Sequence, residues 1–235
     1  LIEALSRNYQ LGILTIDAQT SHRTVVLPGL INIASFVPGL ATPGSKDFRQ
    51  VTEASIAAGF TMIRVMPVGV DTFVTDSTAL SIAQRNTKEG SFCDFNLSVT
   101  ATTSNAETLS QLTGDVGSLF IPFNHLSGNI KVPAVISHFA SWPSSKPILT
   151  DAKGTELASL LLLASLHNRN IHVMNVTSKD DINLVTLSKE KGLKITCDVS
   201  IYSLFLTRSD FPDCAGLPTA EDQKALWEHL SGIDV

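Results

Sequence analysis

Short apolar runs rich in β-branched residues alternate along most of the chain with segments whose apolar residues recur at helical spacing. Seven runs have the composition of buried strands, at residues 24–34, 61–66, 94–99, 118–123, 147–150, 171–176 and 194–199. Alternation of strands with helical segments of about ten to fifteen residues is typical of repeated βα units around a parallel sheet. The hydrophobic pattern therefore predicts an α/β fold.

The helical segments carry start and stop signals. Ser178 and Asp181 have the spacing of a capping box, and Gly192 suits a left-handed helix stop. The last helical segment opens in the same way at Thr219 and Asp222. Its predicted buried side carries Leu226, Trp227 and Leu230.

Seven βα units predict a (β/α)8 TIM barrel whose last unit is missing or truncated. Residues 231–235, "SGIDV", have the pattern of the start of another apolar strand. Residues 1–23 are predicted to form a small flanking β element, and residues 24–235 form the barrel. A doubly wound open sheet is the alternative. Against it, no Gly-x-Gly-x-x-Gly follows the first strand and no P-loop lysine pattern is present.

The composition is that of a globular protein without an evident nucleic-acid or membrane partner. Of the 235 residues, 43% are hydrophobic, which is ample for a sizeable core. The net charge of −5 is spread without acidic or basic runs, so neither nucleic acid nor a membrane surface is expected to bind. The apolar run at 157–166 is about half as long as a membrane-spanning helix. No secretory signal is recognisable at the start, and we expect a cytoplasmic location.

Few groups with useful chemistry fall at the carboxyl ends of the predicted strands, where a barrel places its active site. Asp151, Asn175 and Asp198 are the polar candidates there. A catalytic transition metal needs about three or four converging imidazole, thiolate or carboxylate ligands, and the three cysteines are far apart. One or two carboxylates could at best hold a hard cation loosely. We therefore expect no metal, no cofactor and no catalytic residue.

The histidines and Ser35 do not change this expectation. His172 lies three residues before Asn175 on a predicted strand, so alternation places it toward the helices if Asn175 faces the barrel mouth. His125 follows the fourth strand and is the histidine predicted nearest the mouth. Ser35 ends the first strand, where His125 and Asp151 could approach it, but no nucleophile-elbow pattern surrounds it. We interpret Ser35 as a packing residue.

Seven fragments in order carry a family resemblance: "LPGLIN", "ASIAAGFTMIRVMP", "CDFNL", "HFASWPS", "IHVMNVTSKDDI", "GLKITCDVS" and "ALWEHLSGID". Together they resemble the dihydroorotases of the amidohydrolase superfamily. The resemblance is nearest to the dihydroorotase domain inside the large animal and fungal multifunctional proteins of pyrimidine biosynthesis. It covers the chain from about residue 10. It implies a TIM barrel of the amidohydrolase type. Each fragment alone is weak evidence for the family, whereas seven fragments in the family's order are strong evidence.

The metal ligands that this resemblance would supply are missing. Active members follow the first strand with His-x-His, and the matching positions here are Ala34 and Phe36. The carboxylated lysine of strand four, which bridges two zinc ions in the family, maps near Leu119. The histidines of strands five and six map to Asp151 and Asn175. The aspartate of strand eight would lie beyond residue 235.

The substrate-binding residues of the family are also replaced. The arginine that completes the first-strand motif maps to Pro38, and the asparagine that follows strand two maps to Val68. Without these groups the metal would not acidify its water, and the substrate carboxylate would lose its charged partner. We expect Ala34, Phe36, Val68 and Leu119 to collapse into apolar packing at the former site.

The resemblance therefore implies an inactive dihydroorotase-like domain. Such a domain would serve as a structural and oligomerising module, a homodimer, between carbamoyl-phosphate synthetase and aspartate transcarbamoylase modules of the same chain. Two alternatives stay open. The barrel could be an active cyclic-amide hydrolase with a relocated site built from Asp151, Asn175, His125 or Asp198. It could also be a regulatory barrel that binds a small molecule.

Overall fold

The computed structural model describes residues 28–68, 73–123 and 130–234, and describes only the backbone of Pro67 and Val68. The predicted flanking element at 1–23 lies outside these residues. The strands are β1 (Leu30–Pro38), β2 (Phe60–Val68), β3 (Asp94–Thr100), β4 (Ser118–Ile121), β5 (Ile148–Thr150), β6 (Ile171–Val173) and β7 (Ile195–Cys197). The helices are α2 (Asp47–Ala57), α3 (Ser77–Gly90), α4 (Ala106–Gln111), α5 (Val132–Ser141), α6 (Gly154–Leu166), α7 (Lys179–Glu190), α8 (Ile201–Phe205), α9 (Ala220–Glu228) and the 3₁₀ helix η1 (Leu230–Gly232).

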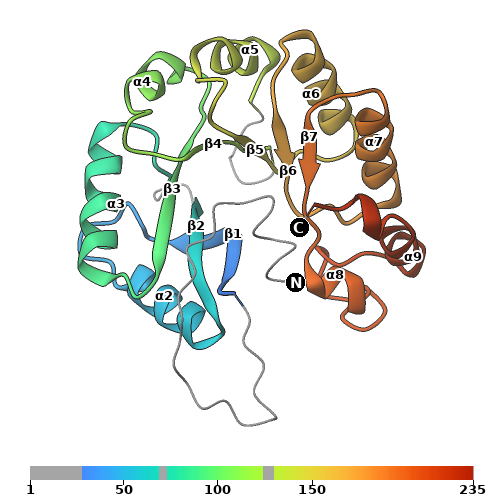
Figure 1. Ribbon diagram of the computed structural model, residues 1–235, viewed down its shortest axis with the longest axis horizontal. Coiled ribbons are helices and arrows are strands. Elements are labelled where there is room, and N and C mark those ends of the chain that lie inside the picture. Colours follow the sequence, from blue (N-terminus) through green and yellow to red (C-terminus); the bar gives the residue numbers. More distant parts are fainter. Residues whose placement is uncertain (1–27, 69–72, 124–129, 235) are drawn as a thin grey trace.

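The seven described strands form one parallel sheet in the order of the chain, β1 to β7. Figure 1 shows this sheet curled, with the helices around its outside. An unbroken order is that of a barrel, because a doubly wound sheet reverses its strand order at a switch point. The predicted α/β barrel with an incomplete eighth unit is confirmed over the described residues, and the doubly wound alternative is wrong.

The end of the described chain differs from the prediction. Residues 231–235 were expected to begin an eighth strand, but Leu230–Gly232 is a 3₁₀ helix and Asp234 follows it without strand structure. Asp234 nevertheless touches the edge of the sheet. Its backbone N–H donates to the carbonyl of Cys197 at 3.1 Å, and its Oδ2 accepts from the backbone N–H of Cys197 at 2.8 Å. Both backbone groups of this β7 residue are therefore satisfied without a neighbouring strand.

A continuous layer of buried apolar side chains lies between the sheet and the helices, and we call it the outer core. It joins alternate residues of the strands to one face of each covering helix. Its members include Ile63, Val99, Leu119, Ile121, Ile148 and Val173 from strands, and Leu80, Leu109, Leu157 and Val185 from helices. Burial of each large aliphatic side chain contributes about 1.5–3 kcal/mol, so this layer holds the helices in place around the strands.

The helix ends follow the sequence signals in part. Thr219 and Asp222 form a complete capping box at α9. At α7, the Ser178 hydroxyl accepts from the N–H of Asp181 at 3.1 Å, but the reciprocal half of the predicted box is absent. Asp181 instead reaches the preceding helix, where its Oδ1 accepts from the N–H of Gly154 at 2.7 Å. Each carboxylate satisfies an otherwise unpaired amide at a helix start.

The described helices are too short for a membrane span. None of them combines the length and the apolar composition needed to cross a bilayer.

Candidate functional site

The candidate site lies at the carboxyl ends of the strands, because parallel strands of a barrel bring these ends to one face. Metal-binding side chains are sparse in the described part of the chain, where no three histidine, cysteine or carboxylate groups gather closely enough to hold an ion. Apolar side chains dominate this end of β1, β2 and β4. The polar groups on β5 to β7 are engaged with the backbone, as described below.

Strand β1 brings three side chains without metal-binding atoms to this end. Ala34 is half-buried, Phe36 is 41% exposed and Pro38 is exposed. In the sheet register, Phe36 pairs with Met66 and Pro38 pairs with Val68, so β1 and β2 end side by side. The predicted collapse of Phe36 into apolar packing is therefore incomplete. The structure describes only the backbone of Val68.

A second, smaller group of buried side chains fills the concave side of the sheet, and we call it the inner cluster. Its members are Met66, Phe73, Phe120, Leu149 and Met174, with Ala34 packed against them. Phe120 and Leu149 are register partners on β4 and β5. The interior of the described sheet is therefore apolar at these positions of β2, β4 and β5.

Leu119 lies on the other side of the sheet. Its side chain belongs to the outer core, while that of its neighbour Phe120 belongs to the inner cluster. Because side chains alternate along a strand, Phe120 is the β4 residue that faces the interior. The expectation that Leu119 lines the site is therefore wrong by one residue.

Asp151 follows β5 and is buried. Its Oδ1 accepts a hydrogen bond of 2.7 Å from the backbone N–H of Phe123, just after β4. Bonds from an amide to a carboxylate are among the stronger ones in proteins. This bond ties the carboxylate of Asp151 to the backbone just after β4.

Asn175 and Asp198, which follow β6 and β7, are joined by the same kind of bond from a backbone amide to a carboxylate. Asn175 has an exposed side chain and a left-handed backbone, with φ of 51°. Its backbone N–H donates to Oδ1 of Asp198 at 2.7 Å. The Asp198 carboxylate therefore fixes the turn after β6. The side chain of Asn175 points into solvent and takes no part in this bond.

His172 is a polar side chain inside the curled sheet, and the sequence prediction that it faces the helices is wrong. It is the register partner of Leu149 on β5 and of Thr196 on β7, and Leu149 belongs to the inner cluster. His172 therefore faces the interior, not the helices. Its ring nitrogens bond to Thr196 Oγ1 at 2.8 Å and to Asp198 Oδ2 at 2.9 Å. The same Asp198 thus holds both the turn after β6 and an interior histidine.

A serine nucleophile is not assembled at this face. Ser35 is buried and shares its side of β1 with Val37, a member of the outer core. Its hydroxyl therefore faces the helices, and it has no hydrogen-bond partner within the described residues. Asp151 is held by Phe123 at the strand ends. His125, the third group considered with them, lies outside the described residues.

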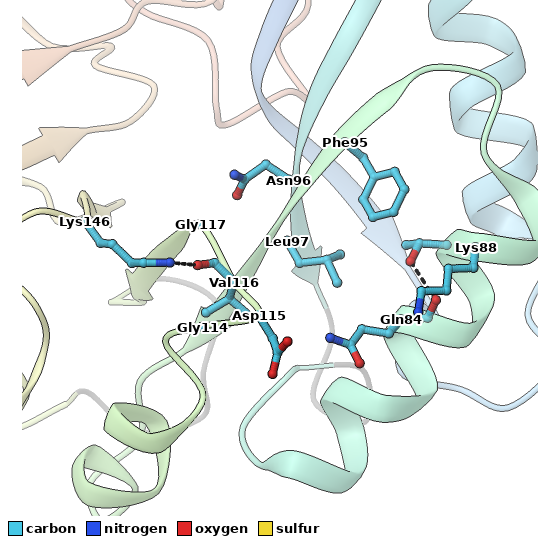
Figure 2. A pocket seen from close by; sticks show the side chains of 11 residues that line it. Gln84, Lys88, Phe95, Asn96, Leu97, Gly114, Asp115, Val116, Gly117 and Lys146 are labelled. Atoms are coloured by element: carbon cyan, nitrogen blue, oxygen red, sulfur yellow. Dashed lines mark hydrogen bonds between the residues drawn. The ribbon is translucent and has the colours of Figure 1, made fainter.

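A hollow of about 510 Å³ lies at the opposite end of the barrel, beside the amino ends of β3 and β4. Figure 2 shows Gln84 and Lys88 on one wall and Gly114 to Gly117 on another, with Lys146 bonded to the carbonyl of Val116. The amino ends of barrel strands serve stability more than catalysis. The lysine here contacts a backbone carbonyl, and we assign the hollow no chemistry.

Comparisons with known proteins agree with this fold. No protein-family model matches the chain. The chain is 70% identical over 236 residues to Multifunctional protein pyrABCN of Emericella nidulans, which covers 100% of this chain and 10% of that protein. A solved structure, the inactive dihydroorotase-like domain of the Chaetomium thermophilum CAD-like multifunctional protein, is 64% identical with a TM-score of 0.86. That match covers 91% of this chain and 64% of the solved chain.

More distant structures share the fold alone. L-Hydantoinase (dihydropyrimidinase) from Arthrobacter aurescens matches 88% of this chain and 56% of its own, with 16% identity and a TM-score of 0.75. The chain spans about a tenth of the length of the curated relatives that it matches over its whole extent.

Proposed function

We propose that this chain, a homologue of the inactive dihydroorotase-like domain of a fungal multifunctional protein, is a non-catalytic barrel with a structural role. Its parent would be a multifunctional enzyme of de novo pyrimidine (UMP) biosynthesis. The observation that carries the proposal is the inner cluster. Phe120 is the interior residue of β4 next to the position that resembles the family's bridging lysine, and the same cluster packs against Ala34 at a former ligand position of β1.

The zinc ions of the dihydroorotase family do not fit the described strand ends. Alanine, phenylalanine and proline stand at the β1 positions, and Phe120 is the inward residue of β4. The carboxylates of Asp151 and Asp198 are hydrogen-bonded to backbone amides of the neighbouring strand. We therefore propose no metal-dependent reaction for this domain.

The proposed partners follow from the position of the homologous region in longer chains. In such a parent, carbamoyl-phosphate synthetase and aspartate transcarbamoylase modules would flank this barrel in the same polypeptide. The barrel would space these modules and pair with a second copy of itself as a homodimer. The proposed location is the cytoplasm. The oligomeric state rests on the family resemblance.

Paired variants of the parent protein test the structural role. Asn175→Ala alters an exposed side chain at a former ligand position, and Leu149→Asp places a charge in the inner cluster. We expect Asn175→Ala to leave carbamoyl-aspartate formation and the assembly mass unchanged. Leu149→Asp is expected to lower both, because an unpaired buried charge unfolds the barrel. Loss of dihydroorotate formation in Asn175→Ala, with the assembly intact, would show that the barrel is catalytic.

A further inference from the structure

Helices α8 and α9 present an uncovered apolar surface beside the last strand. Ile201, Tyr202 and Phe205 are 65%, 67% and 66% exposed, and Trp227 and Leu230 are 44% and 42% exposed. We call these five residues the α8–α9 face. Figure 1 shows α8 and α9 together at the β7 end of the helix ring. Single exposed apolar residues are ordinary, whereas a group of large ones marks a contact surface.

Two aromatic residues of the α8–α9 face, Phe205 and Trp227, hold each other in place. The rings of Phe205 and Trp227 lie 5.6 Å apart at 85°, which is an edge-to-face contact. The indole N–H of Trp227 donates to the carbonyl of Leu204 at 2.8 Å, so the tryptophan is also anchored to α8 by its polar atom. The apolar edges of both aromatic rings are thereby held outward.

Helix α9 carries apolar residues on its buried side and also on a side that the described structure leaves exposed. Ala225 and Leu226 are buried against the barrel. Trp227 of α9 and Leu230 of the following 3₁₀ helix η1 are both exposed, although their pattern predicts burial. A helix with apolar residues on two sides is typical of an element packed between two neighbours. One neighbour is the outer core, and α8 covers Trp227 only in part, since this side chain stays 44% exposed.

The described chain ends next to this surface. Asp234 is bound to the backbone of Cys197 on β7, and Lys189 of α7 bonds to Asp234 as well. Helix α8 begins four residues after Cys197 in the chain. Residues that followed residue 235 in a longer parent would therefore emerge beside the α8–α9 face. The solved homologous domain is longer than the matched region, since the match covers 64% of its length.

We propose that the α8–α9 face is an internal interface, covered in the parent protein by the polypeptide that directly follows residue 235. This inference rests on the proposed origin of the chain in a longer protein. The covering segment presents apolar side chains to Tyr202, Phe205 and Trp227. A short tether favours this occupant, because a segment joined to residue 235 has a high effective concentration at the surface. A second copy of the chain has no such advantage.

Hydrogen exchange and cross-linking in the unmodified parent protein test the inference. Amides of α8 are expected to exchange at least about tenfold more slowly than those of a five-residue helix open to solvent. Lys224, whose side chain is 78% exposed on α9, should cross-link to residues shortly after 235. Cross-links from Lys224 mainly to a flanking enzyme module, or between two copies, would overturn the proposal. Fast exchange of α8 in the parent would do the same.

Thiol labelling in the parent gives an independent measurement. We expect Leu230→Cys to react about tenfold or more slowly than Arg85→Cys, a matched control at an exposed position of α3. Protection that disappears on dilution would identify a second copy as the occupant and contradict the proposal. Each outcome is separate from the catalytic question, because the surface can be covered whether or not the barrel turns over dihydroorotate.

Discussion

His172 Nε2 lies 2.9 Å from Oδ2 of Asp198, inside the curled sheet. A carboxylate only accepts hydrogen bonds, so Nε2 carries a proton, and in the neutral ring Nδ1 accepts from the Thr196 hydroxyl at 2.8 Å. The other oxygen of Asp198 accepts from the backbone of Asn175. The His172–Asp198 pair therefore links β6 to the residue that follows β7, and both Asp198 oxygens accept a hydrogen bond.

Removal of the Asp198 carboxylate should weaken the barrel more than its conversion to an amide. We expect Asp198→Ala to lower the free energy of unfolding by about 2–4 kcal/mol, because two donors lose their acceptor. Asp198→Asn should cost about 1 kcal/mol, since the histidine can reverse its tautomer and accept from the new amide. Urea unfolding measures the loss, and nitrogen NMR of His172 reports the tautomer. Equal losses in the two variants would contradict this arrangement.

Asp181 provides a second test, with a control in the same helical turn. Asp181 is buried and accepts from the N–H of Gly154, whereas Asp180 is exposed. Asp181→Ala should lower the free energy of unfolding by about 1–3 kcal/mol, because it strands a helix-start amide. Asp180→Ala should change it by less than about 0.5 kcal/mol. A reversed order in chemical denaturation would show that the contact between α6 and α7 is unimportant.

The inner cluster should account for a large share of the stability. Phe120→Ala is expected to cost about 3–5 kcal/mol, because it leaves a cavity among Met66, Leu149 and Met174. Phe36→Ala should cost clearly less, since this ring is 41% exposed. Thermal unfolding of the two variants compares them directly. A small effect of Phe120→Ala would mean that the interior is loosely packed and open to a ligand.

His138 makes the fold sensitive to acid. It is buried in α5 and donates from Nε2 to the carbonyl of Thr102 at 2.9 Å. Burial lowers the pKa of His138 below its ordinary value near 6.5. The unfolded chain therefore takes up this proton first as the pH falls. The stability contributed by neutral His138 is complete above about pH 6.5 and declines as the pH falls toward the lowered pKa.

The pH dependence can be assigned with two substitutions. His138→Asn should remove the part of the slope that lies just below pH 6.5. His167→Asn, at an exposed position after α6, should retain that part. Unfolding free energies measured between neutral and mildly acidic pH separate the two cases. An unchanged slope in His138→Asn would assign the acid sensitivity to another group.

The sequence predicted the number and order of the described strands because each apolar run is bounded by clear turn and helix signals. It failed where side-chain direction depends on details of the backbone. His172 was placed by alternation from Asn175, but β6 ends at Val173 and Asn175 is left-handed. Alternation does not continue through such a turn.

The sequence could not show which residues of β4 face the interior, for a different reason. All four residues of Ser118–Ile121 are buried, so no polar residue marks which side faces the helices, and Leu119 and Phe120 could not be told apart. The exposure of Trp227 was also beyond the sequence pattern. Periodicity indicates that a helix side is apolar but does not say which neighbour covers it.

The most direct test of the central claim is the metal content and dihydroorotate turnover of the parent protein. The protein would be purified in the presence of zinc, measured for bound metal, and assayed in both directions of ring closure with its flanking modules intact. The account predicts that this barrel holds no stoichiometric zinc and that neither direction is accelerated. Zinc-dependent turnover that is lost in Asp151→Ala, with the fold retained, would contradict it.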